Sequence, residues 1–250
     1  MAIRIITDSP SDISINEAKE LNLGIVPLKI TFDEKSYVEG VDISVEEFYK
    51  KLDTSENLPT TSTPSPEDYL THFNQAKEAG DDVIVITLSA GISGTYQCAN
   101  LAKDMADYSK IHIIDSGQAT ISQMLLVRYA LSLRDAGKNC DEIVEEIERA
   151  KERVVLLVMV DTLDNLHKGG RLSKSVTLAG NMLKIKPILT LKDGKVGIEG
   201  KARGFKGSIK TILKLIDEYG EIDSSSPVYF GYAGNSDHCS IFKEKSRWKI

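Results

Sequence analysis

Hydroxyl-bearing side chains gather in two short segments, and each segment leads into a predicted helix. Residues 60–65 read Thr-Thr-Ser-Thr-Pro-Ser, and residues 89–96 read Ser-Ala-Gly-Ile-Ser-Gly-Thr-Tyr. The first turn of a helix leaves backbone N–H groups unpaired and carries partial positive charge, so hydroxyl groups placed there favour a small anion. The two segments predict a cradle for a carboxylate or a phosphate group, although Thr61 and Ser62 alone would also suit a simple turn.

Ser93 has three candidate roles on sequence alone. It lies in a stretch, residues 91–95, that partly matches the nucleophile elbow of α/β-hydrolases, but Thr95 stands where that motif has its second glycine. A nucleophile also needs a base, and the contexts of the four histidines single out none of them. Hydrogen bonding to a ligand is therefore favoured over helix capping and over nucleophilic catalysis.

A basic turn with two adjacent glycines forms a third segment, residues 168–174. Lys168 and Arg171 flank the glycines, which let the backbone turn sharply, so a phosphate or an acidic partner would fit. A small-molecule enzyme, hydrolase or transferase, that uses Ser93 or this turn is the alternative function. Neither a Walker A motif nor G-x-G-x-x-G is present, and cysteine and histidine spacings do not match a metal site, so we expect no nucleotide, cofactor or metal.

Charge is distributed unevenly along the chain. The net charge is -6, which argues against a general nucleic-acid binder. Residues 167–214 nevertheless hold twelve Lys or Arg and two acidic residues, whereas residues 1–166 hold fifteen and twenty-nine. A basic segment on an acidic protein marks a docking place for something negative, or it is a solvated lysine-rich face. A regulatory or nucleic-acid-binding protein that uses residues 167–214 is a third, less favoured function.

Strands and helices alternate as in βαβ units over the first part of the chain. Strands are predicted at 2–7, 24–31, 83–88, 111–115, 154–160, 184–190, 195–199 and 228–232, and helices at 15–21, 45–52, 66–79, 94–108, 118–135, 141–152 and 206–219. Asp8 and Asp115 each close a strand, where capping of the next turn is at least as good an interpretation as a catalytic role. We expect an α/β fold of two domains: a three-layer αβα domain with a mostly parallel sheet at 1–153, and a smaller α+β domain at 154–250.

Composition places the chain among globular proteins. With 250 residues, of which 41% are hydrophobic and 27% charged, it can bury a substantial core. The N-terminus reaches Asp8 too early for a secretory signal, and the longest apolar run, residues 154–160, is too short for a transmembrane helix. We expect a cytoplasmic protein without stable membrane insertion and with three reduced cysteines.

The chain resembles the DegV family, which includes the fatty-acid-binding subunits (FakB) of bacterial fatty acid kinase. The resemblance covers nearly the whole sequence and rests on five stretches: Thr7-Asp8-Ser9 with Ser11-Asp12, Thr61-Ser62 followed by Pro64-Ser65, Ser93-Gly94-Thr95-Tyr96-Gln97, Asp115-Ser116, and Leu166 to Ser173. It implies a long-chain fatty acid in a tunnel between two domains, with its carboxylate held by Thr61, Ser62 and Ser93 beside Gly94 and Thr95.

The same resemblance implies that the protein is not itself an enzyme. A separate ATP-dependent kinase catalytic subunit phosphorylates the bound carboxylate to an acyl phosphate, and Lys168, Arg171 and Arg203 are the implied docking contacts. Family members continue through a further segment with Gly-Thr-His and Gly-Pro-Gly, which does not occur after Gly234 here. The second domain is therefore expected to be truncated, with an open sheet edge, and His238 is not assigned the role of the family histidine.

Overall fold

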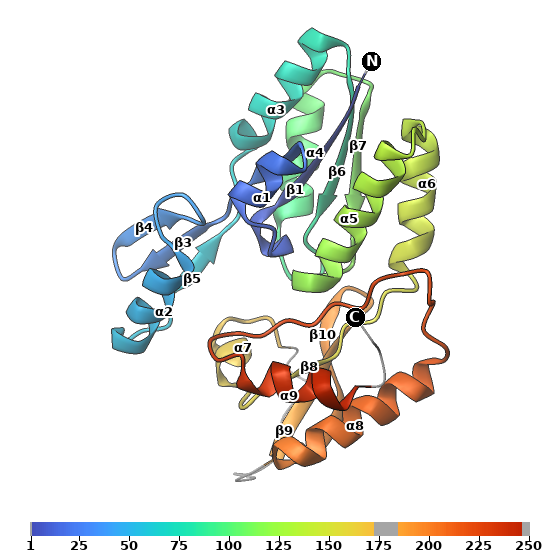
Figure 1. Ribbon diagram of the computed structural model, residues 1–250. Coiled ribbons are helices and arrows are strands. Elements are labelled where there is room, and N and C mark those ends of the chain that lie inside the picture. Colours follow the sequence, from blue (N-terminus) through green and yellow to red (C-terminus); the bar gives the residue numbers. More distant parts are fainter. Residues whose placement is uncertain (1, 173–184, 247–250) are drawn as a thin grey trace. The chain divides into compact units, whose positions relative to one another are not determined.

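The chain divides into two compact units, Met1–Val154 and Val155–Ile250 (Figure 1). The structure, a computed structural model, describes residues 2–172 and 185–246. Over these residues, no helix has both the length and the apolar character needed to cross a membrane. Each unit has its own sheet and core, so each is described by itself.

The first unit alternates strands with helices along most of its length. Its elements are β1 (Ile3–Asp8), a 3-10 turn (Ser9–Ser11), α1 (Ile15–Glu20), β2 (Leu23–Val26), β3 (Lys29–Phe32), β4 (Lys35–Val38), α2 (Val45–Thr54), β5 (Thr60–Ser62), α3 (Pro66–Ala79), β6 (Asp82–Thr87), α4 (Thr95–Ala106), β7 (Ile111–Asp115), α5 (Thr120–Asp135) and α6 (Cys140–Lys151). The expected α/β class is confirmed.

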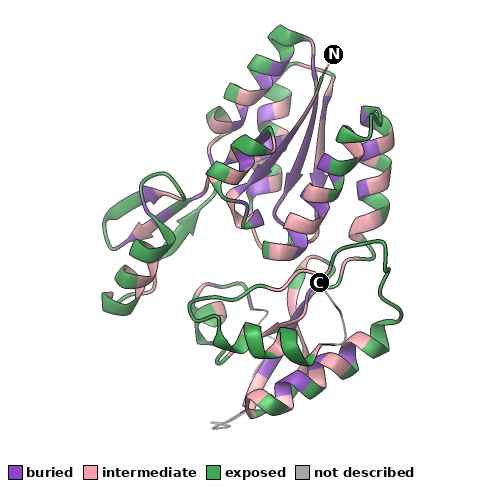
Figure 2. Cartoon of the chain, in the orientation of Figure 1, coloured by how far each residue is buried: buried purple, intermediate pink, exposed green. Residues whose placement is uncertain are grey.

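Its main sheet has the strand order β2-β1-β6-β7, and every neighbouring pair is parallel. One core packs α5 and α6 against one face of this sheet through residues such as Leu126 and Ile143, and a second packs α3 and α4 against the other through Phe73 and Ala99. Figure 2 shows the strands buried between these two helix layers. Because both faces are covered, the strands can be continuous runs of Val and Ile.

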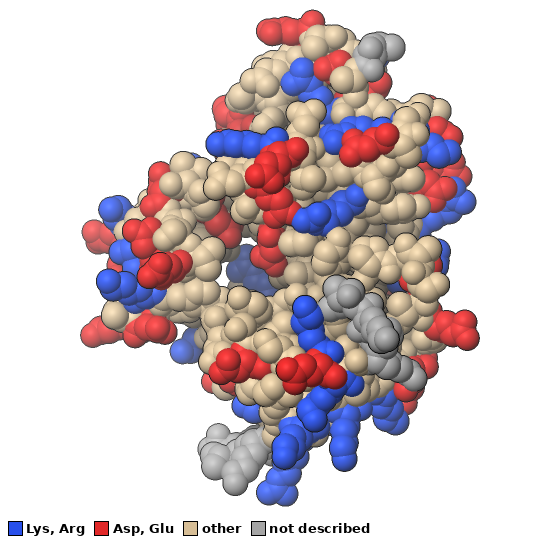
Figure 3. Space-filling view, in the orientation of Figure 1, with Lys and Arg blue, Asp and Glu red and all other residues tan. Residues whose placement is uncertain are grey.

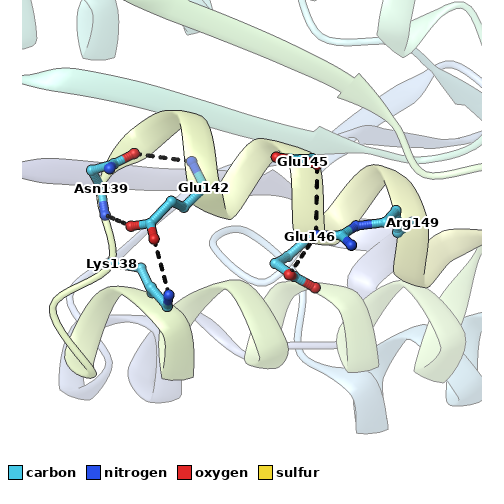
Figure 4. A network of polar contacts seen from close by, with 6 residues as sticks. All are labelled: Lys138, Asn139, Glu142, Glu145, Glu146 and Arg149. Atoms are coloured by element: carbon cyan, nitrogen blue, oxygen red, sulfur yellow. Dashed lines mark hydrogen bonds and ion pairs between the residues drawn. The ribbon is translucent and has the colours of Figure 1, made fainter.

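Local capping signals set the starts of the helices. Ser44 and Glu47 form a capping box at α2, and Pro66 occupies the first turn of α3, as predicted. Asn139 Oδ1 accepts from the Glu142 amide at 3.0 Å and begins α6, while Lys138 pairs with Glu142 (Figure 4). On the following turns of the same helix, Arg149 pairs with Glu145 and Glu146.

The predicted strand at 24–31 is wrong, because the chain changes sheet in the middle of it. β2 ends at Val26, and after Pro27 and Leu28 the chain enters β3 in a separate antiparallel sheet of order β4-β3-β5. Pro27 has no N–H group to continue a hydrogen-bonded ladder, which explains the break. This small sheet and α2 enclose their own core around Ile30 and Phe32.

The second unit contains a three-stranded antiparallel sheet and three helices among its described residues. They are β8 (Val158–Met159), α7 (Asp164–Lys168), β9 (Ile185–Lys192), β10 (Lys195–Arg203), α8 (Gly204–Tyr219) and α9 (Asp237–Lys245), with sheet order β10-β9-β8. The predicted hairpin forms, and its two central residues, Asp193 and Gly194, have φ of 49° and 70°, as a type I′ turn requires. Its core contains Ile188 and Leu215.

Two strand predictions for this unit need correction. The strand expected at 154–160 shortens to Val158–Met159, and residues 228–232 form no strand. Within the described sheet, the 228–232 segment has no partner strand. Tyr232 is 62% exposed, whereas Phe230 is half-buried and packs against Phe242 of α9. Residues 173 and 174 of the predicted basic turn, and Lys184 of the predicted hairpin, lie outside the described residues.

Candidate anion-binding site

Buried polar residues collect at the carboxyl ends of the parallel strands. Thr7 and Asp8 end β1, Thr87 and Ser89 lie at and beyond the end of β6, and Ser116 follows β7, and all five side chains are buried. The chain runs from β1 to β2 on one side and from β6 to β7 on the other, so the strand order reverses between β1 and β6. Ligands of open parallel sheets bind at such a reversal, outside the carboxyl ends of the strands.

Asp8 connects this edge to the hydroxyl-rich segment after β6. Its Oδ2 accepts from the Leu88 amide at 2.8 Å, and its Oδ1 accepts from Gln123 Nε2 at 2.7 Å. Gln123, a buried residue of α5, also donates to Thr7 Oγ1 at 3.0 Å. These neutral donors satisfy the carboxyl oxygens without a cation.

Burial, with a smaller contribution from the negative charge of Glu39, raises the pKa of Asp8 from 3.8 to about 7, despite the hydrogen bonds from Gln123 and Leu88. Asp12, on the same loop, has a pKa raised to about 6 by partial burial and by Glu39. The Asp8 carboxyl can therefore gain or lose its proton near neutral pH.

Asp115 holds the same segment from β7. Its Oδ1 accepts from the Ala90 amide and from the Gly117 amide, both at 3.0 Å. Asp8 and Asp115 thus fix two points, Leu88 and Ala90, of the backbone that leads to Ser93. Both aspartates bind backbone amides, which matches the capping interpretation of their positions at strand ends.

Ser93 lies at the start of α4, where unpaired helix amides favour an anion. Its amide donates to Ser89 O at 3.1 Å, and its Oγ lies 2.7 Å from Thr95 Oγ1 and accepts from the Thr95 amide at 3.2 Å. Among the described residues, no histidine is a hydrogen-bond partner of Ser93 Oγ. Over the part of the chain that the structure describes, the arrangement is that of a helix-start hydroxyl bonded to Thr95.

Thr61 and Ser62 belong to a strand, not to the loop that the sequence predicts. β5 pairs antiparallel with β3, with Thr61 opposite Ile30 and Ser62 opposite Lys29, and both residues are exposed. Successive side chains of a strand point to opposite faces, so the two hydroxyl groups do not share one face of β5. The short loop after β5 is what approaches the second segment.

The two hydroxyl-rich segments meet between Thr63 and Gly94. A Cβ atom placed on Gly94 would lie 3.5 Å from Thr63 Cγ2, and Cys98 Sγ on α4 donates to Pro64 O at 3.1 Å. Thr63 is two residues from Thr61, and Gly94 adjoins Ser93. The structure therefore brings the predicted segments into contact.

The predicted docking residues are exposed but separated along the second unit. Lys168 ends α7, Arg171 donates to Gly169 O, and Arg203 ends β10. Leu172, next to Arg171, bridges to Val196, which lies about 20 Å from Arg203 along the strand at roughly 3.3 Å per residue. Other exposed cations lie along β9, β10 and α8, and Figure 3 shows Lys and Arg side chains gathered over this unit.

Gln123 is the residue of this site that sequence reasoning missed. It lies inside α5, 115 residues from Asp8, and no local pattern marks it.

Within the described chain, no group of three His, Cys, Asp or Glu residues could hold a metal ion.

Comparison with known proteins shows which family the sequence matches. The family model described as "Uncharacterised protein, DegV family" matches residues 2–250. A DegV domain-containing protein of Caldanaerobacter subterraneus is 39% identical over 218 residues, which cover 87% of this chain and 78% of the relative.

Solved structures resemble the chain as well. A structure described as fatty acid binding of a DegV family protein from Thermus thermophilus has a TM-score of 0.88 at 31% identity. The match covers 98% of this chain and 87% of the Thermus chain. A stearic-acid-binding protein from Eubacterium ventriosum has a TM-score of 0.80 at 31% identity, with 88% and 76% covered.

Proposed function

Because this chain belongs to the DegV family, we propose that it binds a long-chain fatty acid and holds the carboxylate at the segments that meet between Thr63 and Gly94. Ser93 and whichever of Thr61 and Ser62 faces this contact supply the hydroxyl groups, and Gly94 and Thr95 supply the first turn of α4. The contact between these two segments, in a chain 31% identical to a stearic-acid-binding protein, is the observation that carries the proposal. The family resemblance implies that the acyl tail lies in an interdomain tunnel, and this remains a prediction.

The tail and the head group have different tasks in this proposal. Burial of a chain of about 14 methylenes at roughly 0.8 kcal/mol each supplies on the order of 11 kcal/mol before the costs of association. A hydrogen bond to the charged head contributes about 1.5 to 3 kcal/mol. The tail therefore retains the lipid, and the hydroxyl groups orient its carboxylate.

We further propose that the protein presents this carboxylate to an ATP-dependent kinase subunit, which forms the acyl phosphate, and has no catalytic centre of its own. Lys168, Arg171 and Arg203 are the proposed docking contacts. A protein interface of ordinary size covers about 800 Å² on each partner, enough to include two residues about 20 Å apart. The charge of residues 167–214 supports an acidic partner surface.

The alternative of a hydrolase or transferase that uses Ser93 has less support. The described hydrogen bonds of Ser93 Oγ go to Thr95, and a serine nucleophile requires a base within hydrogen-bond reach. Turnover of an activated ester that disappears in Ser93→Ala would reverse this preference.

Single variants of the three hydroxyl residues test the proposal. Thr61→Val, Ser62→Ala and Ser93→Ala are compared with Ser36→Ala, which removes an exposed hydroxyl of the same small sheet outside the two segments. Binding of a fluorescent fatty acid is measured alongside acyl phosphate formation with a purified fatty acid kinase subunit and ATP.

We expect Ser93→Ala to slow phosphorylation at least tenfold while it weakens binding only a few-fold, and Ser36→Ala to change neither. Because Thr61 and Ser62 face opposite sides of β5, their variants should also differ from each other. Equal losses of binding and phosphorylation in Ser93→Ala would contradict the division between tail and head group.

A further inference from the structure

The segment that carries Ser93 is attached to the sheet through a buried carboxyl group. Asp8 Oδ2 accepts from the Leu88 amide at 2.8 Å, and the next residue, Ser89, accepts from the Ser93 amide at 3.1 Å through its carbonyl oxygen. Asp8 is fully buried. The path from Asp8 to Ser93 therefore runs through two hydrogen bonds and one peptide link.

We propose that Asp8 is a positioning residue for the anion site, which holds Ser93 in place through Leu88 and takes up a proton when an anionic head group binds. This inference rests on the proposed function and deepens it, because it adds proton linkage to the same site. Asp8 makes no contact with the ligand in this account.

The surroundings of Asp8 favour its neutral form. Gln123 from α5 and the Leu88 amide just beyond β6 are uncharged donors, and Glu39 beyond β4 is negative. Tyr69 from α3 lies close enough for the charge of Asp8 to raise the pKa of its hydroxyl group. The hydrogen bonds from Gln123 and Leu88 lower the pKa of Asp8, and burial outweighs them. Lys151, a cation at this edge of the sheet, donates to Asp115 O at 3.0 Å and is already paired with Glu148.

Gln123 can support either protonation state. Its Nε2 donates to Asp8, and its Oε1 is buried without a hydrogen-bond partner among the described residues. When Asp8 gains a proton, rotation of the Gln123 amide by half a turn brings Oε1 to accept from the new O–H group. Buried polar groups are normally paired, so the unpaired oxygen fits a group that serves two states.

The size of the linkage follows from distance. Two hydrogen bonds and the backbone of Leu88 and Ser89 separate Asp8 from the Ser93 amide, so an anion bound at Ser93 lies on the order of 10 Å from Asp8. At an effective dielectric constant of about 20 and with screening by salt, repulsion at this distance weakens binding about threefold when Asp8 is ionised. A fatty acid is itself ionised above pH 6, so its own titration adds nothing there.

The experiment measures binding of cis-parinaric acid, a fluorescent fatty acid, to the full chain freed of lipid between pH 6 and pH 8.5. Wild-type protein should lose about threefold in affinity across this range, and Asp8→Asn should lose most of that dependence. Asp12→Asn is the matched control, because Asp12 lies on the same loop without a described bond to Leu88, and it should keep the step near pH 7. An analogue with an uncharged alcohol head should bind wild type equally at every pH.

Calorimetry in two buffers with different ionisation enthalpies tests the inference without any variant. At pH 7.5, wild type should take up a measurable fraction of a proton per fatty acid bound, and this holds even if Asp8→Asn fails to fold. Binding of cis-parinaric acid without proton uptake and without a pH step would overturn the role of Asp8 alone. No binding at any pH would overturn the proposed function itself.

Discussion

Replacement of Asp8 by asparagine should remove a large pH dependence from the stability of the first unit. Burial raises the pKa of Asp8 from 3.8 in the unfolded chain to about 7 in the folded protein. Below pH 3.8 the Asp8 carboxyl group is protonated in both the unfolded and the folded state, so folding buries no charge there. As pH rises from about 4 to 7, the unfolded state ionises while the folded state stays protonated, so stability falls.

The magnitude follows from linkage at about 1.36 kcal/mol for each pH unit. Between pH 5 and pH 7 the two states differ by nearly one proton at Asp8 at first and by half a proton at pH 7, so the free energy of unfolding should fall by about 2.3 kcal/mol and level off above pH 7. The neutral amide of Asp8→Asn carries no such penalty, and Gln123 can reorient to accept from it.

Urea denaturation at pH 5, 6, 7 and 8, followed by circular dichroism, measures the effect as the difference between variant and wild type. This difference cancels the titration of every other group. We expect the free energy of unfolding of Asp8→Asn, relative to that of wild type, to rise by about 2 to 3 kcal/mol between pH 5 and pH 7. A difference that stays constant with pH would show that the folded-state pKa of Asp8 is ordinary and would refute the reasoning.

Three further predictions concern packing, capping and thiol reactivity. Phe73 is fully buried between α3 and the main sheet, so Phe73→Ala should lower the free energy of unfolding by about 3 to 5 kcal/mol in urea titrations, and a loss below 1 kcal/mol would contradict its core position. Ser44 caps α2 with Glu47, so Ser44→Ala should cost about 1 kcal/mol, whereas an unchanged melting temperature would count against the capping box. Burial raises the pKa of the Cys140 thiol to about 12, so maleimide at pH 7.5 should label the half-buried Cys239 first, as peptide mass spectrometry can check; faster labelling of Cys140 would disprove its burial.

Local signals in the sequence predict the fold well where a few neighbouring residues determine the structure. The capping box at Ser44, Pro66 in the first turn of α3, and the turn at Asp193 and Gly194 each depend on short-range hydrogen bonds or on backbone preference. The parallel strands are equally visible, because burial on both faces requires apolar runs.

Long-range partners decide what the sequence does not show. Residues 24–31 look like one strand, yet Pro27 divides them between two sheets, and residues 228–232 resemble a strand without a partner among the described residues. The hydroxyl segments are recognisable by composition, but β5 and its alternation depend on pairing with β3. Gln123 is invisible because its role comes from a contact with Asp8, far away in the chain.

Native mass spectrometry of the protein purified from bacterial cells, followed by solvent extraction, tests the central claim most directly. The account predicts one long-chain fatty acid per chain in wild type and in Ser36→Ala. With a fatty acid labelled with ¹³C at its carboxyl group, NMR of the complex should show a carboxyl resonance that shifts when Ser93 is replaced by alanine. Protein that carries no lipid and takes up none when fatty acid is added would contradict it.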